Sequence, residues 1–275
     1  MGFPKVLWNA PFASIRKMIT NLVVSLFDQL GYAIRRKSYF PSYPYGLEKE
    51  IEDAISTVRS HTMVPIEGLI TLYDQAVFCE THNIAGSFVE CGTWKGGAVG
   101  IMALANLKHG VARRHIHLFD SFEGLPEPDA AVDGEHAIQQ ARIVGAGAGG
   151  RLTPIGAEAY VGSLEENQNL LERKIGYDGN YLHYHKGWFQ ETLPKVANSI
   201  GDIAILRLDG DWYASTQICL EYLYDKVVSG GFVVIDDYLG FEGCKKAVDE
   251  FLDSRKIKVY LNHVDRYRRY WIKPS

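Results

Sequence analysis

Two pairs of aspartates give the sequence its strongest chemical signal. Each pair follows an apolar run: Asp209 and Asp211 lie in LDGDWYAST after IAILRLD, and Asp236 and Asp237 lie in GFVVIDDY. If the two runs are neighbouring parallel strands, their carboxyl ends bring all four acids to one edge of a sheet. Carboxylates packed together repel one another, so such a cluster requires protons or a bound cation.

These acids predict a metal site. Oxygen ligands without neighbouring histidine or cysteine suit Mg²⁺, Ca²⁺ or Mn²⁺ rather than zinc. We expect Asp209, Asp236 and Asp237 to hold the ion, which would bind two substrate hydroxyl oxygens and lower the pKa of the reacting one. Asp211 is then free to act as the general base. Helix caps or turns would explain one or two of these acids, but not all four at adjacent strand ends.

A glycine-rich turn forms a second candidate site. In ECGTWKGG, which overlaps the end of the apolar run SFVEC, Gly92 and Gly96 allow the backbone to approach a ligand closely. Glu90 is suited to accept a hydrogen bond from a ligand's ammonium group. The turn stands where doubly wound folds bind nucleotides, but it lacks the G-x-G-x-x-G spacing of dinucleotide sites. A tight turn with a solvated glutamate is the alternative.

Asp120 ends the next apolar run, HIHLFD. An acid at this position is suited to accept hydrogen bonds from both hydroxyls of a ribose, and Ser121 and Phe122 would then lie beside an adenine. The alternative is a helix-capping or turn aspartate, which is a frequent use of this residue.

The pattern around these residues predicts the fold class. Near-continuous apolar strands separated by helices imply a parallel sheet that is covered on both faces. The last two strands leave no room for a helix between them, so they must form an antiparallel hairpin. We predict an α/β, Rossmann-like fold with a seven-stranded, mostly parallel sheet, which is the architecture of class I methyltransferases. The strands are expected at residues 87–91, 115–120, 181–185, 203–209, 231–237, 258–264 and 266–272, and helices at 47–58, 67–82, 216–227, 243–255 and from the glycine-rich turn to 108.

Two segments lie outside this alternating pattern. Residues 1–46 combine an amphipathic helix with a proline- and tyrosine-rich linker, and they precede the main domain at 47–275. The helix carries its basic residues at its two ends, so we expect it to pack on a second subunit of a homo-oligomer rather than on a membrane. The insert at about 121–180 is too long for an ordinary loop, and its GAGAGG run offers hinges. We expect this insert to act as a lid that excludes water.

Composition narrows the function classes. The 275 residues carry a formal net charge of −4, which argues against a nucleic-acid partner and favours a small, neutral substrate. The four cysteines form no C-x-x-C pair, which indicates buried thiols in a reducing compartment. The longest uncharged run near the N-terminus, 18–27, is too short to span a membrane, and no cleavage site follows it. We therefore expect a cytoplasmic protein.

Five motifs, taken in order, resemble the macrocin O-methyltransferase family: ECGTWKGG, DSFEGLP, KGWFQETLP, LRLDGDWYAST and GGFVVIDDY. The similarity begins at about residue 62, and it is most specific at the two aspartate motifs. It implies methyl transfer from S-adenosylmethionine to a sugar hydroxyl, notably in antibiotic biosynthesis, with Mg²⁺ on Asp209, Asp236 and Asp237. Family members differ in the residue that takes the proton, so both Asp211 and Asp209 remain candidates for the base.

The resemblance also implies the cofactor contacts and the origin of the acceptor pocket. Residues 1–45 and 121–180 match the family least, apart from DSFEGLP, and would shape the pocket for a glycoside or sugar. The residues that the resemblance assigns to S-adenosylmethionine are Thr62, Met63, Glu90, Cys91, Gly92, Thr93, Trp94, Gly96, Asp120, Ser121, Phe122, Gly187 and Trp188.

Three other functions fit the residues less well. A nicotinamide-dependent oxidoreductase would need the absent dinucleotide spacing and a hydride-transfer pair such as Tyr-x-x-x-Lys at a strand end. A non-catalytic binding module of a polysaccharide pathway has no reason to retain mutually repelling acids. A catechol or polyphenol methyltransferase shares the fold and the metal, but usually completes its site with an amide ligand and a lysine base. The Asp-Gly-Asp spacing favours a sugar acceptor instead.

Overall fold

The structure is a computed structural model that describes residues 49–143 and 160–275. The chain divides into two compact units, Met1–Glu48 and Lys49–Ser275, and all described residues belong to the second. The helix and linker expected before residue 47 lie outside the described residues, as does the GAGAGG run of the insert.

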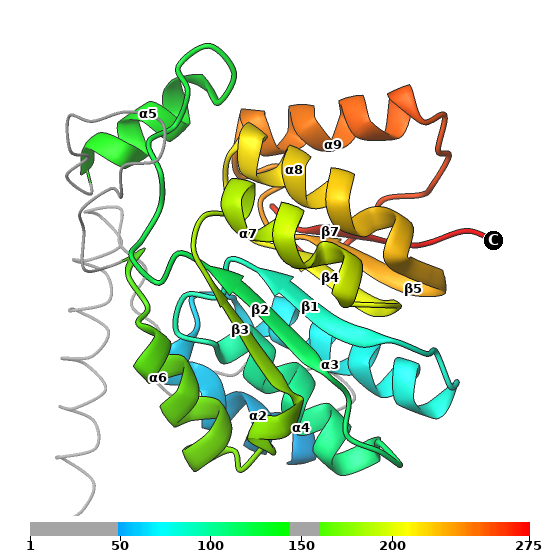
Figure 1. The fold of residues 1–275 in the computed structure, drawn as a ribbon. Coiled ribbons are helices and arrows are strands. Elements are labelled where there is room, and N and C mark those ends of the chain that lie inside the picture. The colour runs from blue at the N-terminus through cyan, green and yellow to red at the C-terminus, as the bar shows by residue number, and fades with distance from the viewer. Residues whose placement is uncertain (1–48, 144–159) are drawn as a thin grey trace, which may run out of the picture. The chain divides into compact units, whose positions relative to one another are not determined.

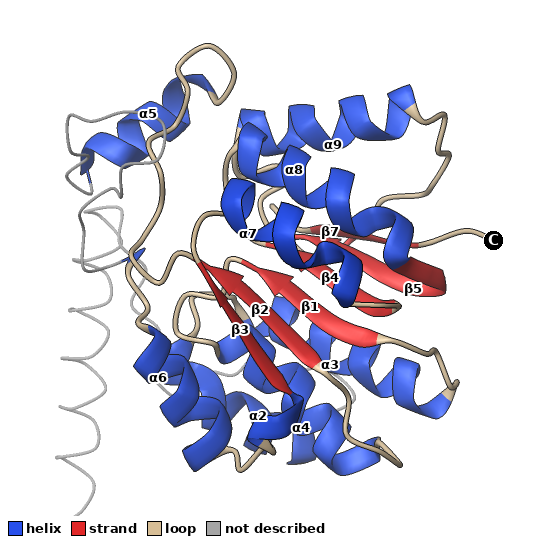
Figure 2. Cartoon of the chain, viewed as in Figure 1, coloured by secondary structure: helices blue, strands red, loops and turns tan. Residues whose placement is uncertain are grey.

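A seven-stranded sheet organises the described residues (Figures 1 and 2). Its order is β3-β2-β1-β4-β5-β7-β6; the first five pair in parallel, and β7 runs antiparallel to both β5 and β6. The predicted fold class and closing hairpin are therefore confirmed. The strands are β1 Ser87–Cys91, β2 Ile116–Asp120, β3 Leu182–Lys186, β4 Ile203–Leu208, β5 Val227–Ile235, β6 Asn262–His263 and β7 Arg269–Ile272.

Helices cover both faces of this sheet (Figure 1). α2, α3 and α4 lie on one face, and α7, α8 and α9 lie on the other. On the second face, Leu220 and Leu223 of α8 pack with Leu206 and Val233 of the sheet in one buried apolar cluster. The helices are α2 Lys49–Val58, α3 Ile66–Thr81, α4 Gly97–His109, α5 Gly134–Ile143, α6 Leu164–Gln168, α7 Phe189–Val196, α8 Tyr213–Leu223 and α9 Glu242–Ser254.

The central strands carry the apolar sequences that burial on two faces requires. Every residue of β1 and of β4 is buried. Each of these strands nevertheless contains one acidic or basic side chain, and the strand register makes these two residues, Glu90 and Arg207, direct neighbours. The sheet thus departs from its apolar pattern close to its carboxyl edge.

The insert at 121–180 contains regular structure on both sides of its undescribed part. After that part, α6 continues into a π-helix at Asn169–Lys174, which contacts α4 and buries Leu170 and Leu171. The part of the insert after its undescribed residues therefore packs with the helices that cover the sheet. Among the described residues, the lid therefore remains a prediction for α5.

Several elements differ from the sequence-based prediction. α5, α6 and α7 were not predicted, and α7 forms although Pro194 lies inside it. The predicted strand at 258–264 is reduced to β6, an edge strand that pairs with β7 alone. α8 begins at Tyr213 rather than at Thr216. Across the two described stretches, no helix is both long enough and apolar enough to cross a membrane.

Candidate active site

Strand pairing brings the expected acids to one edge of the sheet. β4 lies between β1 and β5, so the loop after it meets the loops of both neighbours. The backbone N–H of Asp209 donates to the carbonyl of Cys91 at 2.8 Å, and that of Asp236 donates to the carbonyl of Leu208 at 2.9 Å. These bonds extend the parallel ladders by one residue and fix where both loops begin.

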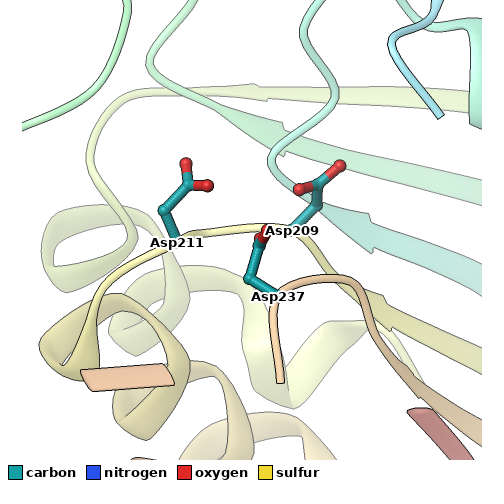
Figure 3. A group of neighbouring side chains, drawn as sticks. All are labelled: Asp209, Asp211 and Asp237. Carbon is teal, nitrogen blue, oxygen red and sulfur yellow. The ribbon is translucent and has the colours of Figure 1, made fainter. Parts of the chain in front are cut away.

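Three acids approach one another at this edge (Figure 3). One carboxylate oxygen from each of Asp209, Asp211 and Asp237 lies within 4.8 Å of the other two, and no other such group of metal-ligand side chains occurs among the described residues. The backbone of Asp211 has φ of 58°, in the left-handed region that side-chain-bearing residues rarely adopt. Backbone strain of this kind is found mainly at functional sites.

The electrostatics of this cluster require shared protons or a bound cation. Burial, followed by the charges of the neighbouring acids, raises the pKa of Asp209, Asp211 and Asp237. Oδ2 of Asp237 is buried and accepts no hydrogen bond from any described residue. The cluster must therefore share protons or bind a positive ion, and its purely carboxylate donors fit Mg²⁺, Ca²⁺ or Mn²⁺.

Asp236 points to two arginines rather than into this cluster. It accepts hydrogen bonds from Nε of Arg268 at 2.7 Å and Nη2 of Arg268 at 2.6 Å, and a third from Arg207. The sequence grouped Asp236 with Asp209 and Asp237, whereas the structure groups Asp211 with them. The difference arises because β7 pairs with β5. Arg268 directly precedes β7, so this pairing brings its positive charge next to Asp236, although the two residues are far apart in sequence.

Arg207 connects these acids with the glycine-rich turn. Its buried guanidinium contacts Glu90 and Asp236 and donates to Oδ2 of Asp209 at 2.8 Å. Burial raises the pKa of Glu90 to about 8, although the charge of Arg207 acts in the opposite direction. Oε2 of Glu90 is buried without a hydrogen-bond partner among the described residues. Glu90 can therefore accept a bond from a cationic group of a ligand.

The glycine-rich turn packs tightly against the loop after β4. Gly92 has φ of 88°, and a Cβ atom at this position would lie 1.8 Å from the carbonyl oxygen of Asp209. Glycine is required here because the protein's own backbone, rather than a ligand, makes the close approach. Gly96 has φ of 80° and stands as the N-cap of α4.

Asp120 holds this turn from the neighbouring strand. Its Oδ2 accepts hydrogen bonds from the backbone N–H groups of Thr93 at 2.6 Å and Trp94 at 3.1 Å, and its Oδ1 accepts one from Phe122 at 2.7 Å. Burial raises the pKa of Asp120, and these amide bonds counteract the shift. Asp120 therefore acts as a turn aspartate here, and a ribose hydroxyl would share its carboxylate with the turn.

Two cavities with a shared wall open at this edge. They enclose about 720 and 680 Å³, open solvent included, and both are lined by Met63, Trp94, Tyr160, Asp209 and Asp211. Of the other expected residues, the first cavity is lined by Gly92, Asp120, Ser121, Gly187 and Trp188, and the second by Thr62, Glu90, Thr93, Asp236 and Asp237.

Three expected cofactor residues line neither cavity. Cys91 is buried in the apolar cluster between the sheet and α8, with Leu208 and Cys219, because alternate residues of a strand face opposite sides of a sheet. Gly96 and Phe122 also lie outside both linings. Cys91 thus belongs to the core, whereas Gly96 and Phe122 belong to the turns around the site.

Several residues at the site escaped the sequence prediction. Arg207 carried a usable signal, since it is a charged residue within an apolar run. No sequence pattern marks Arg268 or Tyr160 as a site residue, because only the folded chain brings them to the cavities. Asp133 is buried and accepts the backbone N–H of Tyr213 at 2.7 Å, which fixes the start of α8 just after the aspartate motif.

Comparison with known proteins decides the family. The family model described as Macrocin-O-methyltransferase (TylF) matches residues 16–273. The chain belongs to this family. The match starts well before residue 62, where the sequence motifs placed its beginning, so it includes much of the N-terminal segment.

Individual macrocin O-methyltransferase relatives agree with this assignment. Demethyldecarbamoylnovobiocin O-methyltransferase from Streptomyces niveus is 34% identical over 216 residues, which cover 78% of this chain and 76% of the relative. The 8-demethyl-8-(2,3-dimethoxy-alpha-L-rhamnosyl)-tetracenomycin-C 4'-O-methyltransferase from Streptomyces olivaceus is 32% identical over 212 residues, 77% of this chain and 75% of the relative. The solved O-methyltransferase NovP superposes with a TM-score of 0.68 at 28% identity, covering 94% of this chain and 99% of that one. The chain is thus an S-adenosylmethionine-dependent O-methyltransferase.

Proposed function

We propose that this enzyme methylates a sugar hydroxyl of a glycosylated natural product and that it requires Mg²⁺. The observation that carries the proposal is the cluster of Asp209, Asp211 and Asp237 at the edge shared by both cavities. A methyltransferase that needed only to bind its cofactor would have no use for three mutually repelling acids at this point. The rhamnosyl group named for the relative from Streptomyces olivaceus supports a sugar as the acceptor.

The cofactor would occupy the first cavity and reach toward Glu90. The unpartnered Oε2 of Glu90 suits the ammonium group of S-adenosylmethionine, and the carboxylate of Asp120 suits its ribose. Gly187 and Trp188 line the same cavity from the end of β3. When bound, the cofactor supplies an activated methyl group on a positively charged sulfur.

Asp209 and Asp237 are the metal ligands that the geometry supports best. Both belong to the cluster of Asp209, Asp211 and Asp237, and Oδ2 of Asp237 is a buried acceptor without a hydrogen-bond partner among the described residues. We keep Asp236 as the candidate third ligand, which would have to share its carboxylate with Arg268. A bound Mg²⁺ would supply Lewis-acid chemistry, lowering the pKa of the acceptor hydroxyl.

Asp211 is the proposed general base, with Asp209 as the alternative. Burial raises the pKa of Asp211, which makes its ionised carboxylate a stronger proton acceptor. Asp211 would take the proton of the acceptor hydroxyl as the hydroxyl oxygen accepts the methyl group. S-adenosylmethionine would supply that methyl group from its sulfonium, with the electron pair of the carbon–sulfur bond returning to sulfur.

The acceptor is tested with matched pairs of compounds. The full chain is incubated with methyl-labelled S-adenosylmethionine, Mg²⁺ and a panel of glycosides, their aglycones and free catechols. We expect label only in glycosides, with mass fragmentation placing the methyl group on the sugar, and strongly reduced label with Asp211→Asn. Label on aglycones or catechols but never on a sugar would overturn the proposed acceptor.

We also propose a cytoplasmic location. Cys79, Cys91, Cys219 and Cys244 are all free and buried, and free thiols suit a reducing compartment. Fractionation of cells that express the full chain tests this directly, with activity expected in the cytosolic fraction.

A further inference from the structure

A helix of the insert lies directly over the glycine-rich turn. α6 starts at a capping box in which Ser163 and Glu166 exchange backbone and side-chain hydrogen bonds. The next residue, Asn167, is fully buried, which is unusual for an amide side chain. The side chain of Asn167 therefore faces the protein rather than solvent.

Asn167 binds the turn through its amide group. Nδ2 donates to the carbonyl oxygen of Trp94 at 2.6 Å and to that of Ser163 at 3.0 Å. Asn167 packs closely against Gly96 of the turn, since a Cβ atom on Gly96 would lie 2.5 Å from Oδ1 of Asn167. On the other side, a Cβ atom on Gly162 would lie 2.0 Å from the same Trp94 carbonyl.

Trp94 needs such support because of its conformation. Its φ is 46°, in the left-handed region that disfavours a bulky side chain. The backbone of Trp94 is held at both ends, because Asp120 accepts its N–H and Asn167 donates to its carbonyl. Trp94 lines the cavity proposed for the cofactor, so a change in its backbone would alter the site where S-adenosylmethionine is proposed to bind.

We propose that Asn167 is a positioning residue that sets the cofactor turn through the Trp94 carbonyl. The second half of the insert would then belong to the cofactor site, although it lies about 70 residues from the turn in sequence. This inference rests on the proposed binding of S-adenosylmethionine at the turn. It assigns to Asn167 a role in affinity for the cofactor rather than in methyl transfer.

Two variants of Asn167 test this role. Asn167→Asp keeps the shape but has no amide donor and turns a carboxylate oxygen toward the Trp94 carbonyl, and Asn167→Ala removes the group without adding charge. We expect either variant to raise the dissociation constant of S-adenosylhomocysteine at least about tenfold in calorimetry, equivalent to about 1.4 kcal/mol. The KM for S-adenosylmethionine should rise similarly, while the KM for the acceptor stays unchanged.

Two control variants separate positioning from general loss of stability. Glu166→Gln keeps the capping box but breaks the ion pair with Lys95 at 3.0 Å, and it should bind S-adenosylhomocysteine normally. Leu171→Ala opens a cavity in the π-helix that follows α6 and leaves the hydrogen-bonding groups of Asn167 and Trp94 in place, so it should lower Tm and leave the affinity unchanged.

The outcomes are distinguishable. If Leu171→Ala weakens cofactor binding as much as the Asn167 variants do, or if folded Asn167 variants bind normally, Asn167 has no positioning role. If the wild-type chain itself binds no S-adenosylhomocysteine, the proposed cofactor site fails first.

Discussion

Asp209, Asp211, Asp236 and Asp237 have the same side chain, and their neighbours give them different chemistry. Asp236 is compensated by Arg207 and Arg268, and Asp209 shares Arg207. Asp237 keeps an unused oxygen, and Asp211 sits on a strained backbone. These differences suggest separate roles for ligand and base within one cluster of acids.

The first prediction separates the two roles by substitution. Asp211→Asn keeps the shape but removes the basic oxygen, so turnover should fall roughly 10²–10⁴-fold with Mg²⁺ affinity nearly unchanged. Asp237→Asn should instead weaken Mg²⁺ binding, and excess metal should restore part of the activity. Both are measured as initial rates over a Mg²⁺ titration, with metal affinity determined by calorimetry.

Asp209→Asn and Asp236→Asn complete this comparison. Full activity in Asp211→Asn, together with an Asp209→Asn enzyme that binds metal but does not turn over, would reverse the two assignments. Normal Mg²⁺ affinity in Asp236→Asn would remove Asp236 from the ligand set. If Asp211→Asn then weakened metal binding, Asp211 would take its place.

The strands and their acidic carboxyl ends were predictable because they follow from local patterns, since apolar runs mark buried parallel strands. Whether the two aspartate strands are neighbours was left open by the sequence, and the pairing of β4 with β1 and β5 is seen only in the structure. The partner of Asp236 was not predictable, since Arg268 reaches it only through the β5–β7 pairing. Asn167 was missed for the same reason, because its contact with Trp94 joins two elements that no sequence pattern links.

At the level of the strands, neighbouring histidines on β2 and on the edge strand β3 make stability depend on pH. His117 of β2 and His185 of β3 stack, with their ring nitrogens 3.1 Å apart. Burial, followed by the charge of nearby His183, lowers the pKa of His117 to about 3 and that of His185 to about 4. Below pH 6.5 these two histidines therefore bind protons in the unfolded chain while they stay neutral in the folded chain.

The free energy of unfolding should consequently fall as the pH drops from about 6.5 toward 4. Each of these histidines contributes up to about 1.4 kcal/mol per pH unit. His117→Gln should flatten this dependence relative to wild type in urea titrations at pH 7, 6 and 5. If the free energy of unfolding depends on pH in the variant as it does in the wild type, the lowered pKa of His117 is not the cause of this dependence.

α5 is the part of the insert that we propose to move. It packs through Ala137 and Ala141 on Trp212, which form a small apolar cluster apart from the main core. Gln140 of α5 donates to the hydroxyl of Tyr160 at 2.7 Å, and Tyr160 lines both cavities. Occupation of the cavities can thus be transmitted to this helix.

Hydrogen exchange measures this motion. Amides of 134–143 should exchange faster than those of α3 in the free enzyme, because few buried contacts hold α5. Exchange in α5 should slow when S-adenosylhomocysteine and a glycoside are bound together. Equal exchange in the free and doubly bound enzyme would make α5 a fixed structural element.

For the whole molecule, we propose that the N-terminal segment serves subunit packing. The family match includes residues from 16 onward, although this segment lies outside the described residues. Removing residues 1–46 should lower the oligomeric state in light scattering, and neither form should bind anionic vesicles. Strong vesicle binding by the full chain would favour a membrane role for the segment instead.

The acidic side chains that line the second cavity outnumber the basic ones. The second cavity is lined by five carboxylates, those of Glu90, Asp209, Asp211, Asp236 and Asp237, against the two arginines Arg207 and Arg268. A cofactor with a cationic ammonium group and a divalent metal would together offset this excess of negative charge. Cofactor and metal are therefore expected to stabilise the folded enzyme when both are present.

Metal dependence is the most direct test of this account. Methyl transfer to a verified glycoside is measured with the wild-type enzyme after EDTA treatment and again after Mg²⁺ is returned. The account predicts a loss of at least about 10²-fold in EDTA and recovery with Mg²⁺, because the acceptor hydroxyl depends on the ion to lower its pKa. Full activity in EDTA would contradict the central claim.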